Sequence, residues 1–296
     1  MQTDPQGPIA IAGAGRMAQS LGRLLRERGE RIAAVASRQM DHARAAVEFI
    51  GEGEAVSYPC LPRCAQRVLI AVSDGAIPHV AAVLAEAGMS GGAALHTCGA
   101  HGPEILAPLA ARGVSCGTLH PLQTVASPAQ GVEALQGCTF GITAEGAAAA
   151  WAERIAAMLG GRALFVPADK RPLWHAAAVM ASNYVVALVD AAVMLMGAAG
   201  IEERDALAAV APLVKASSAN ALSLGPVRAL TGPVERGDVE TVTTHLSALA
   251  AAPPAVRAFY RAAALQALDI ARRRGIEETK ARKLEEVLRE SGGKNA

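Results

Sequence analysis

The stretch "IAIAGAGRMAQSLGRLL" (residues 9–25) decides how the chain begins to fold, because an apolar run, a glycine turn and a helical pattern follow one another in it. Its "GAGRMA" segment has the spacing GxGxxA. Gly13 permits a tight turn, Gly15 lets a pyrophosphate approach the backbone, and the small Ala18 lets the helix pack closely on the strand. The start of the helix adds free N–H groups that bind anions.

A second apolar run, "RIAAVAS" (residues 31–37), completes the strand–helix–strand context that this glycine pattern requires. We therefore expect the turn to bind a dinucleotide; the alternative is a purely structural turn. The residues expected to line the cofactor here are Gly13, Ala14, Gly15, Arg16 and Met17.

The end of the second strand predicts which dinucleotide binds. Enzymes that use NAD usually place an acidic residue there, which accepts a hydrogen bond from the ribose 2′-hydroxyl. In this chain Ser37 and Arg38 occupy that place, and the nearest acid, Asp41, lies beyond them. A guanidinium and a hydroxyl suit a 2′-phosphate, so we expect NADP. The alternative for Arg38 is a solvated surface cation.

The first half of the chain alternates between strand-like and helix-like runs. Strands are expected at residues 8–13, 31–37, 67–73, 93–98, 113–119, 138–143 and 162–167. Strands that are apolar throughout and joined by helices indicate a parallel sheet covered on both faces. The predicted fold class is α/β, with a doubly wound Rossmann domain at residues 1–168 and an all-helical domain at residues 169–296.

Composition excludes several kinds of partner. The chain has 296 residues with 28 Lys and Arg against 27 Asp and Glu, so we expect no nucleic acid or anionic membrane as its main partner. Its five Cys form no metal-type cluster, so neither a disulfide nor a metal is expected, and the cytoplasm is the expected location. The start "MQTDPQGP" lacks the pattern of a signal peptide, and the tail "RESGGKNA" is expected to fray.

One segment, residues 176–201, is long and apolar enough to cross a membrane. Asn183 and Asp190 lie inside it, and an Asp near the middle of a membrane helix costs about 2.5 to 3.5 kcal/mol. We therefore expect a buried helix of a soluble protein.

Seven motifs follow one another along the chain: "IAGAGRMA", "ASR", "VSDGAIP", "LHTCGA", "LHPLQT", "HAAAVMASNYVVAL" and "LTGPVERGD". In this combination the chain, from Ile9 to about Ala271, resembles a bacterial family of Rossmann-like proteins with a C-terminal domain of unknown function, the domain-of-unknown-function 2520 family. The family is similar to pyrroline-carboxylate reductase, to deazaflavin-dependent NADP reductase and to the 6-phosphogluconate dehydrogenase group. The resemblance implies an NADP-binding fold, a helical second domain and a dimer, and it implies no particular substrate.

Three further residues follow predicted strands, where ligands bind in such sheets. Ser73 and Asp74 end the strand of "VSDGAIP", and in the similar enzymes the backbone at this point lines the cofactor. Gly99 follows "LHTC" and would allow the nicotinamide half to approach. The alternative for Asp74 is the N-cap of a helix.

The segment "GTLHPLQTVA" places His120 at the carboxyl end of a strand, with Gln123 in the turn that follows. His120 could donate a proton or a hydrogen bond to a substrate carbonyl. Gln123 is a candidate substrate-binding residue. The alternative for His120 is a structural role, in which the ring fixes the loop by bonding a backbone carbonyl.

The helix expected near residues 176–196 carries a polar stripe on an otherwise apolar surface. At 100° per residue, His175, Ser182, Asn183 and Asp190 fall within one arc. Either these side chains bond one another, or they face a cleft in which His175 and Asn183 are catalytic and Ser182 binds substrate. In the hydroxyacid dehydrogenases that this helix resembles, a Lys lies four residues before the Asn; here that position is Val179. The pattern is therefore nearer to the imine reductases.

The segment "LTGPVERGD" (residues 230–238) surrounds a Gly-Pro turn. In relatives such a loop closes the substrate pocket, so Thr231 and Arg236 are candidate substrate-binding residues, Arg236 as an anchor for a carboxylate. The alternative is a connection between helices with Asp238 as an N-cap.

These observations predict an NADP-dependent oxidoreductase that transfers a hydride between nicotinamide and a small carbonyl or imine substrate. Two alternatives stay open: a non-catalytic NADP-binding sensor or partner protein, and a deazaflavin-dependent NADP reductase. A helix that is apolar around nearly its whole circumference must be covered on all sides. We therefore also expect a homodimer whose interface lies within residues 175–270.

Overall fold

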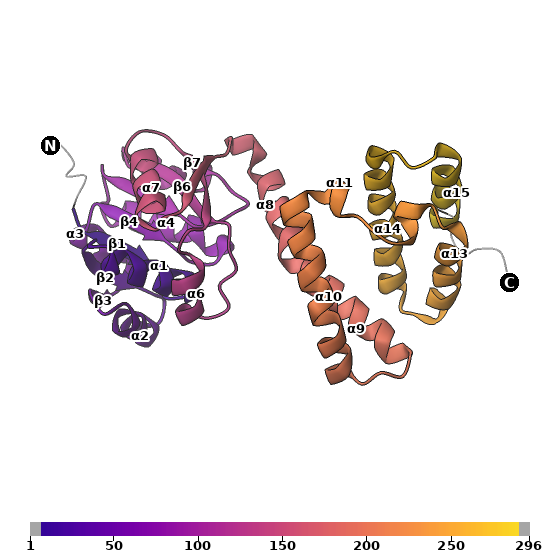
Figure 1. Cartoon of the computed structure of the whole chain (residues 1–296). Coiled ribbons are helices and arrows are strands. Elements are labelled where there is room, and N and C mark those ends of the chain that lie inside the picture. Colours follow the sequence, from indigo (N-terminus) through magenta and orange to yellow (C-terminus); the bar gives the residue numbers. More distant parts are fainter. Residues whose placement is uncertain (1–6, 290–296) are drawn as a thin grey trace. The chain divides into compact units, whose positions relative to one another are not determined.

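The computed structural model describes residues 7–289, so the expected fraying of the last residues lies outside the described part (Figure 1). By its internal contacts the chain divides into two compact units, Met1–Ser182 and Asn183–Ala296, and each is described separately here. The division lies after Ser182, so a helix that the sequence assigned to the helical domain groups with the sheet in this structure.

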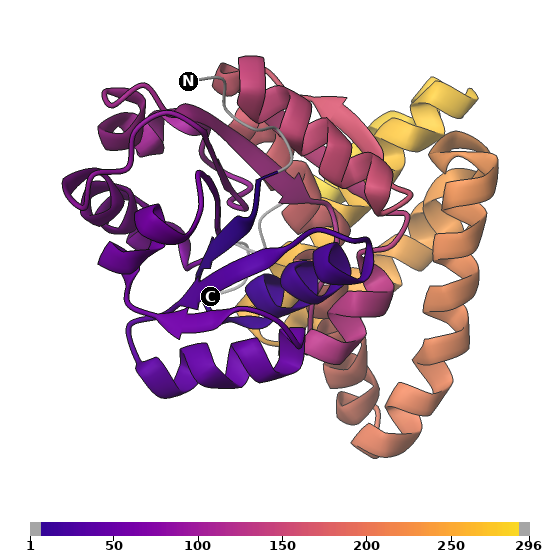
Figure 2. The ribbon, with the colours of Figure 1, turned by 90° about the vertical axis from the view of Figure 1, so that its left-hand side faces the viewer.

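An eight-stranded sheet forms the centre of the first unit, with the order β3-β2-β1-β4-β5-β6-β7-β8 (Figure 2). Its strands are β1 (Ile9–Ala12), β2 (Ile32–Ala36), β3 (Glu54–Val56), β4 (Arg67–Ile70), β5 (Ala93–His96), β6 (Ser115–Pro121), β7 (Thr139–Ala144) and β8 (Arg162–Phe165). The first six follow the doubly wound order 3-2-1-4-5-6, so the predicted Rossmann fold is confirmed. The sequence missed β3, which has three residues and lies at the edge.

Helices cover both faces of this sheet. The helices of this unit are α1 (Arg16–Glu27), α2 (Met40–Ile50), α3 (Leu61–Cys64), α4 (Ile77–Glu86), α5 (Ala107–Ala110), α6 (Pro128–Ala134), α7 (Gly146–Met158) and α8 (Arg171–Ala181). Of α8 only its first residue, Arg171, is buried. Short 3-10 turns occur at Tyr58–Cys60, Asp74–Ala76, Pro103–Leu106 and Ala168–Lys170.

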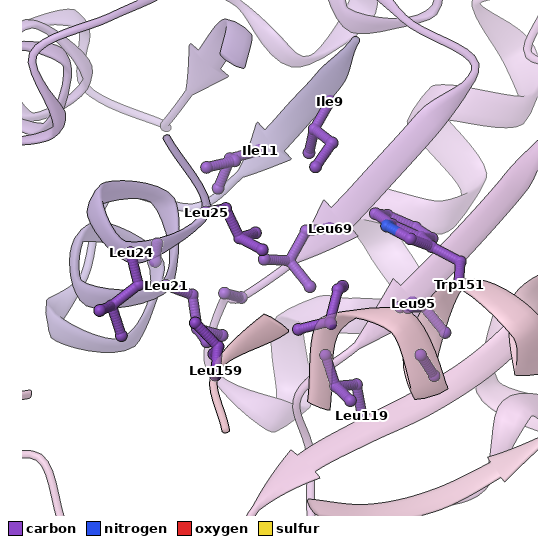
Figure 3. Packing of buried hydrophobic residues seen from close by; sticks show 14 of the residues in the cluster. Ile9, Ile11, Leu21, Leu24, Leu25, Leu69, Leu95, Leu119, Trp151 and Leu159 are labelled. Carbon is purple, nitrogen blue, oxygen red and sulfur yellow. The ribbon is translucent and has the colours of Figure 1, made fainter. Parts of the chain in front are cut away.

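Alternate residues of the central strands build two separate cores. Ile9 and Ile11 of β1 pack with Leu21 and Leu25 of α1 and with Trp151 of α7 on one face (Figure 3). Ala10 and Ala12 turn to the other face, where they pack with residues of α3, α4 and α5. The alternation follows from the two-residue period of a strand, and it explains why both kinds of position in β1 are apolar.

The last two strands depart from the predicted all-parallel sheet. β7 runs antiparallel to β6, with His120 directly opposite Gly141, and β8 runs parallel to β7. For β7 to run parallel to β6, the chain would first have to cross back along the whole length of the sheet. The connection instead holds only the short helix α6, and Leu122 already bonds back to Thr139 at the end of β6. The chain therefore turns back on itself.

The second unit is helical, as predicted. Its helices are α9 (Asn183–Ala198), α10 (Glu203–Leu224), α11 (Pro226–Ala229), α12 (Pro233–Arg236), α13 (Val239–Ala248), α14 (Pro254–Arg274) and α15 (Glu278–Arg289), with a 3-10 turn at Leu249–Ala251. The core of this unit brings together Val234, Val242, Leu268 and Leu284, from α12 to α15. The sequence had not singled out α15.

The apolar helix expected at residues 176–196 is not continuous in the structure. It is interrupted at Ser182, whose backbone leaves the helical region (φ −125°, ψ −74°) between α8 and α9. In the single chain no residue of α9 is buried, so the expectation that this helix is covered stays a prediction that depends on a partner. By length and composition alone, the helical segments Ala168–Ala198 and Glu203–Leu224 could each cross a membrane, which is weak evidence for a span.

Candidate functional site

A pocket of about 560 Å³ opens at the carboxyl ends of β1 and β4, where the strand order of the sheet reverses. Dinucleotides bind at this switch point in doubly wound folds. The predicted cofactor residues that line it are Gly13, Ala14, Gly15, Arg16, Met17, Ser37, Arg38 and Ser73. The pocket is also lined by residues that the sequence did not single out: Tyr58, Ala71, Val72, Ala76, His79, Val80 and Val125.

Glycine occupies the two positions of the turn for different structural reasons. Gly13 has φ +129°, and a Cβ there would overlap the carbonyl oxygen of Ala71 on the neighbouring strand. Gly15 is the N-cap of α1 with φ −78°, and a Cβ there would meet nothing within 4 Å. Gly13 therefore lets the strands pack, while Gly15 faces open space at the helix start.

The first turn of α1 is suited to an anion. The N-cap residue Gly15 has no side chain that could bond the first N–H groups of the helix, and the first turn carries no acidic residue. The backbone N–H groups at this end are thus free to bind a phosphate, and the helix dipole favours negative charge there. Arg16 adds a cation and donates from Nη1 to the carbonyl of Ala126 over 3.1 Å, which ties the loop after β6 to the pocket.

The far end of the pocket is basic and aromatic. Ser37 and Arg38 follow β2, and Arg38 is close enough to Tyr58 for its charge to lower the pKa of that phenol, although burial raises the pKa by more. His79 of α4 lines the same pocket. Tyr58 lies just after β3, the strand that the sequence missed, so no pattern pointed to it.

The other two predicted cofactor residues, Asp74 and Gly99, lie outside the lining of this pocket. Asp74 begins a 3-10 turn. Burial raises the pKa of the Cys98 thiol, and the Asp74 carboxylate lies close enough to that thiol to raise it further. Asp74 therefore faces the carboxyl end of β5. Gly99 lies on the same edge of the sheet, beneath two histidine rings.

These rings belong to His120 of β6 and His175 of α8, which the structure brings together. Their centroids are 5.9 Å apart in an edge-to-face arrangement. A Cβ at Gly99 would come within 2.8 Å of His120 Nε2 and would overlap His175 Nδ1. Only glycine leaves room for both rings. Nδ1 of His175 is buried, and none of residues 7–289 offers it a hydrogen-bond partner.

The environment of His120 keeps its ring neutral. Desolvation by burial is the largest cause and the Arg171 guanidinium the next, and together they lower the pKa of His120 to about 4. Arg171 is fully buried and donates to the carbonyl oxygens of Gly141 (3.1 Å) and Cys98 (2.8 Å). Within the described part of the chain it forms no ion pair, although the Glu104 carboxylate acts on it, and its charge acts in turn on its neighbours.

Trp174 completes this group of residues. Its indole Nε1–H donates to Nδ1 of His120 over 3.0 Å, and its ring lies on Gly141, where a Cβ would come within 2.7 Å of the indole. The sequence analysis missed Trp174 and Arg171. The signal available was their position beside His175 in "KRPLWHAAA", but their role depends on which strands the helix start meets.

The remaining predicted site residues are placed as follows. The Gln123 side chain bonds within its own loop, donating to Ala134 O (3.2 Å) and accepting from Thr124 N (2.8 Å). Ser182 donates to Ala178 O (2.7 Å) at the interruption between α8 and α9, and Asn183 is the first residue of α9. In the second unit, Thr231 and Arg236 are exposed, and Asp238 caps α13 by accepting from Thr241 N.

The residues of the pocket fit a dinucleotide phosphate. The open space above Gly15, the free N–H groups of α1 and the cations Arg16 and Arg38 supply the donors that a diphosphate and a further phosphate need. In the part of the chain that the structure describes, no group of His, Cys, Asp and Glu could hold a metal ion.

Comparisons with known proteins agree with this fold. Residues 3–121 match the family model of the Rossmann-like domain, and residues 138–267 match the model of a domain of unknown function (DUF2520). The chain thus carries a Rossmann-like domain followed by a DUF2520 domain, as the motifs had indicated. No curated protein matches it in sequence.

Several solved structures are similar over nearly the whole chain. A protein of Bacteroides fragilis proposed to be an NADP oxidoreductase has a TM-score of 0.70 and 22% identity, covering 95% of this chain and 99% of its own. A protein of Thermotoga maritima has a TM-score of 0.70 and 23% identity, covering 90% and 98%. The reductive aminase of Aspergillus terreus, solved with NADPH and ethyl-5-oxohexanoate, has a TM-score of 0.60 and 18% identity, covering 96% and 92%. At these identities the likeness concerns the fold.

Proposed function

We propose that the chain is an NADP-dependent oxidoreductase that transfers a hydride between nicotinamide and the carbonyl or imine carbon of a small molecule. The observation that carries this proposal is the pocket at the switch point of the sheet, with Gly15 open to a phosphate and with Ser37 and Arg38 in place of an acid. The reductive aminase of similar fold was solved with NADPH, which supports the same cofactor here.

Bound nicotinamide supplies or accepts the hydride, so the protein's own task is to bind, orient and stabilise charge. The α1 start binds the diphosphate, and Arg16 adds charge beside it. Ser37 and Arg38 bind the 2′-phosphate. Val72 and Val80 contribute apolar lining to the pocket.

The residues that act on the substrate remain proposals. His120 and His175 lie together at the edge of the sheet where ligands bind in such folds, and the unpartnered Nδ1 of His175 can bond a polar substrate atom. Asn183 remains the third proposed catalytic residue. Gln123, Ser182, Thr231 and Arg236 remain proposed substrate-binding residues.

We further propose that the protein works as a homodimer in the cytoplasm. The uncovered apolar helices α9 and α10 support the dimer. All five cysteines lie within the described residues and are free thiols, which suits a reducing compartment.

The test is NADPH oxidation, followed at 340 nm, against a panel of ketones, aldehydes, keto acids and preformed imines. Turnover of at least one class is expected, and the variant Gly15→Val is the control that lacks the phosphate site. A protein that binds both NADPH and NADP and turns over nothing in the panel is the sensor alternative, and that result would reject the enzyme.

A further inference from the structure

The hydrogen bond between Trp174 and His120 fixes where the proton of His120 lies. An indole N–H is a donor and never an acceptor, so the Nδ1 atom that faces it at 3.0 Å must carry a lone pair. A neutral imidazole that accepts at Nδ1 carries its hydrogen at Nε2. Nε2 is the atom that lies over Gly99, at the edge of the sheet where the proposed substrate binds.

We propose that His120 acts as a neutral hydrogen-bond donor through Nε2–H, that Trp174 is the positioning residue that sets this tautomer, and that the substrate is therefore a carbonyl compound rather than an iminium ion. This inference rests on the proposed function and deepens it. A carbonyl oxygen accepts a hydrogen bond from Nε2–H. An iminium nitrogen is itself cationic and has no lone pair to offer a donor.

The charges around His120 favour the same choice. Arg171, buried between Gly141 and Cys98, places a positive charge beside the ring. It forms no ion pair in residues 7–289, although the charge of the Glu104 carboxylate acts on it. His175 and His96 add no negative charge. Among the described residues, the exposed Asp74 carboxylate acts on His120, and its effect on the ring is smaller than that of Arg171. The Glu104 carboxylate acts on Arg171 and His96. This setting stabilises negative charge on a substrate oxygen and disfavours a cation.

The positions of His120 and Trp174 depend on two glycines as much as on the rings themselves. Gly141 stands directly opposite His120 across the β6–β7 ladder, and its missing side chain leaves the place that the Trp174 indole fills. Arg171 holds the same strand through the carbonyl of Gly141, and Gly99 leaves room for Nε2 of His120. The start of α8 therefore delivers Arg171, Trp174 and His175 together to the ends of β5, β6 and β7.

In the reduction, the carbonyl carbon would gain the hydride that reduced nicotinamide gives up. One C–H bond of the cofactor would break as the new C–H bond forms, so the cofactor would be oxidised as the carbonyl is reduced. The electron pair of the C=O π bond moves to the oxygen, where the Nε2–H of His120 stabilises the developing charge. The oxygen takes its proton from water, and His120 ends the step as the same neutral ring. A neutral imidazole can polarise a carbonyl in this way without acting as the acid.

The first test reads the tautomer directly. The full-length protein, labelled with ¹⁵N at its histidines, is examined by long-range ¹H–¹⁵N correlation between pH 5 and 8, and His120 is assigned from its loss in His120→Gln. We expect an Nε2–H ring that stays neutral throughout. In Trp174→Phe, which keeps an aromatic ring and removes the donor, we expect a mixture of both tautomers, while the signals of exposed His42 stay unchanged.

The second test determines the substrate class and the roles of Trp174 and of the Nε2–H group of His120. With NADPH we expect turnover of carbonyl compounds and none of preformed iminium ions, with a kcat/KM that shows no titration near pH 6.5. Trp174→Phe should lower kcat by about 10- to 100-fold, the range for outer partners that orient a ring, with little change in KM. His120→Gln, whose amide places an N–H near the Nε2 position, should keep more activity than His120→Asn.

Three results would overturn the inference in separable ways. An Nδ1–H tautomer, or an imidazolium at pH 6 to 7, rejects the role of Trp174. Turnover of iminium ions in preference to carbonyls rejects the substrate class. No turnover of any compound by a protein that binds NADPH rejects the proposed enzyme and the substrate class with it, while the NMR result still decides the tautomer. Thermal unfolding of each variant shows whether a loss reflects folding instead.

Discussion

Gly13 packs directly against the carbonyl group of Ala71, so that the end of β1 and the end of β4 meet without a side chain between them. A Cβ at Gly13 would overlap that oxygen, and the backbone there has φ +129°, a region that other residues rarely adopt. We predict that Gly13→Ala lowers the free energy of unfolding by about 1 to 3 kcal/mol. Urea unfolding measures the loss, and Gly15→Ala, at φ −78° with open space, is the matched control, which should change it little.

A larger side chain at Gly15 should separate binding from folding. The Gly15→Val side chain enters the open space at the start of α1, where a phosphate would lie, and it meets no protein atom within 4 Å of its Cβ. We predict loss of NADPH binding by calorimetry with unchanged helical content by circular dichroism. Normal binding by this variant would mean that the glycine turn is structural only.

The basic end of the pocket should distinguish the two dinucleotides. Arg38 lines the pocket after β2 with Ser37 beside it, so Arg38→Ala removes a charge-assisted bond to a 2′-phosphate. Such bonds contribute about 1.5 to 3 kcal/mol, which corresponds to about a 10- to 100-fold rise in the Kd of NADPH. The Kd of NADH, measured by the same fluorescence titration, should stay within about twofold. Equal affinity of the unaltered protein for NADH and NADPH would contradict the assignment.

His96 should make the stability of the protein depend on pH. Its ring is fully buried, with Nδ1 accepting from Cys98 N and Nε2 facing Gly102 O, and burial lowers its pKa to about 4. The unfolded chain, with an ordinary histidine pKa near 6.5, therefore binds more protons than the folded one between pH 6.5 and 4, so stability is full above pH 6.5 and falls as pH drops.

This group contributes a slope of up to about 1.4 kcal/mol per pH unit in that window. We predict that His96→Gln reduces the slope of the unfolding free energy against pH by up to that amount, as well as lowering stability at neutral pH. His42→Gln, on the exposed face of α2, is the matched control. An unchanged slope in His96→Gln would show that the pKa of His96 is the same in the folded and the unfolded protein.

The local patterns in the sequence were enough to predict the strand–helix–strand start. The apolar run of β1, the glycines and the α1 pattern all lie within 17 residues, and the lining of the pocket by Gly13–Met17 follows from that short range. β3 was not predicted, because its three residues are too few to show the two-residue alternation of a strand. The antiparallel direction of β7 was not predicted either. It depends on the short connection through α6, and the packing of α6 on α1 sets that connection rather than any local propensity of the sequence.

The roles of Trp174 and Arg171 could not be read from the sequence for a different reason. A Trp beside a His on a helix has no fixed partner until the strands beneath it are known. Here the antiparallel β6–β7 pair sets His120 opposite Gly141, and only that register gives the indole both a place to lie and an acceptor to bond. Ser182 likewise was not expected to interrupt the helix, since the apolar helical pattern continues on both sides of it.

The last prediction concerns the apolar surface of α9 and α10. Large apolar side chains stand exposed on both helices of the single chain, with Val186 71% exposed on α9 and Leu222 88% exposed on α10. Soluble monomers rarely leave so contiguous an apolar surface in water, and a two-fold partner that offers the same surface would cover it. We predict an obligate homodimer with its interface within residues 175–270, more than half of it apolar.

Light scattering at micromolar concentration with NADPH present should give the mass of two chains, and a clean monomer would refute the prediction. Val186→Glu and Leu222→Glu place a charge on the surface to be buried, and a buried unpaired charge costs several kcal/mol, so each should shift the protein toward monomer. Lys283→Glu, a charge change on the exposed face of α15, is the matched control and should leave the dimer intact. If detergent or lipid vesicles, rather than a second chain, are needed to keep the unaltered protein in solution, the surface faces a membrane instead.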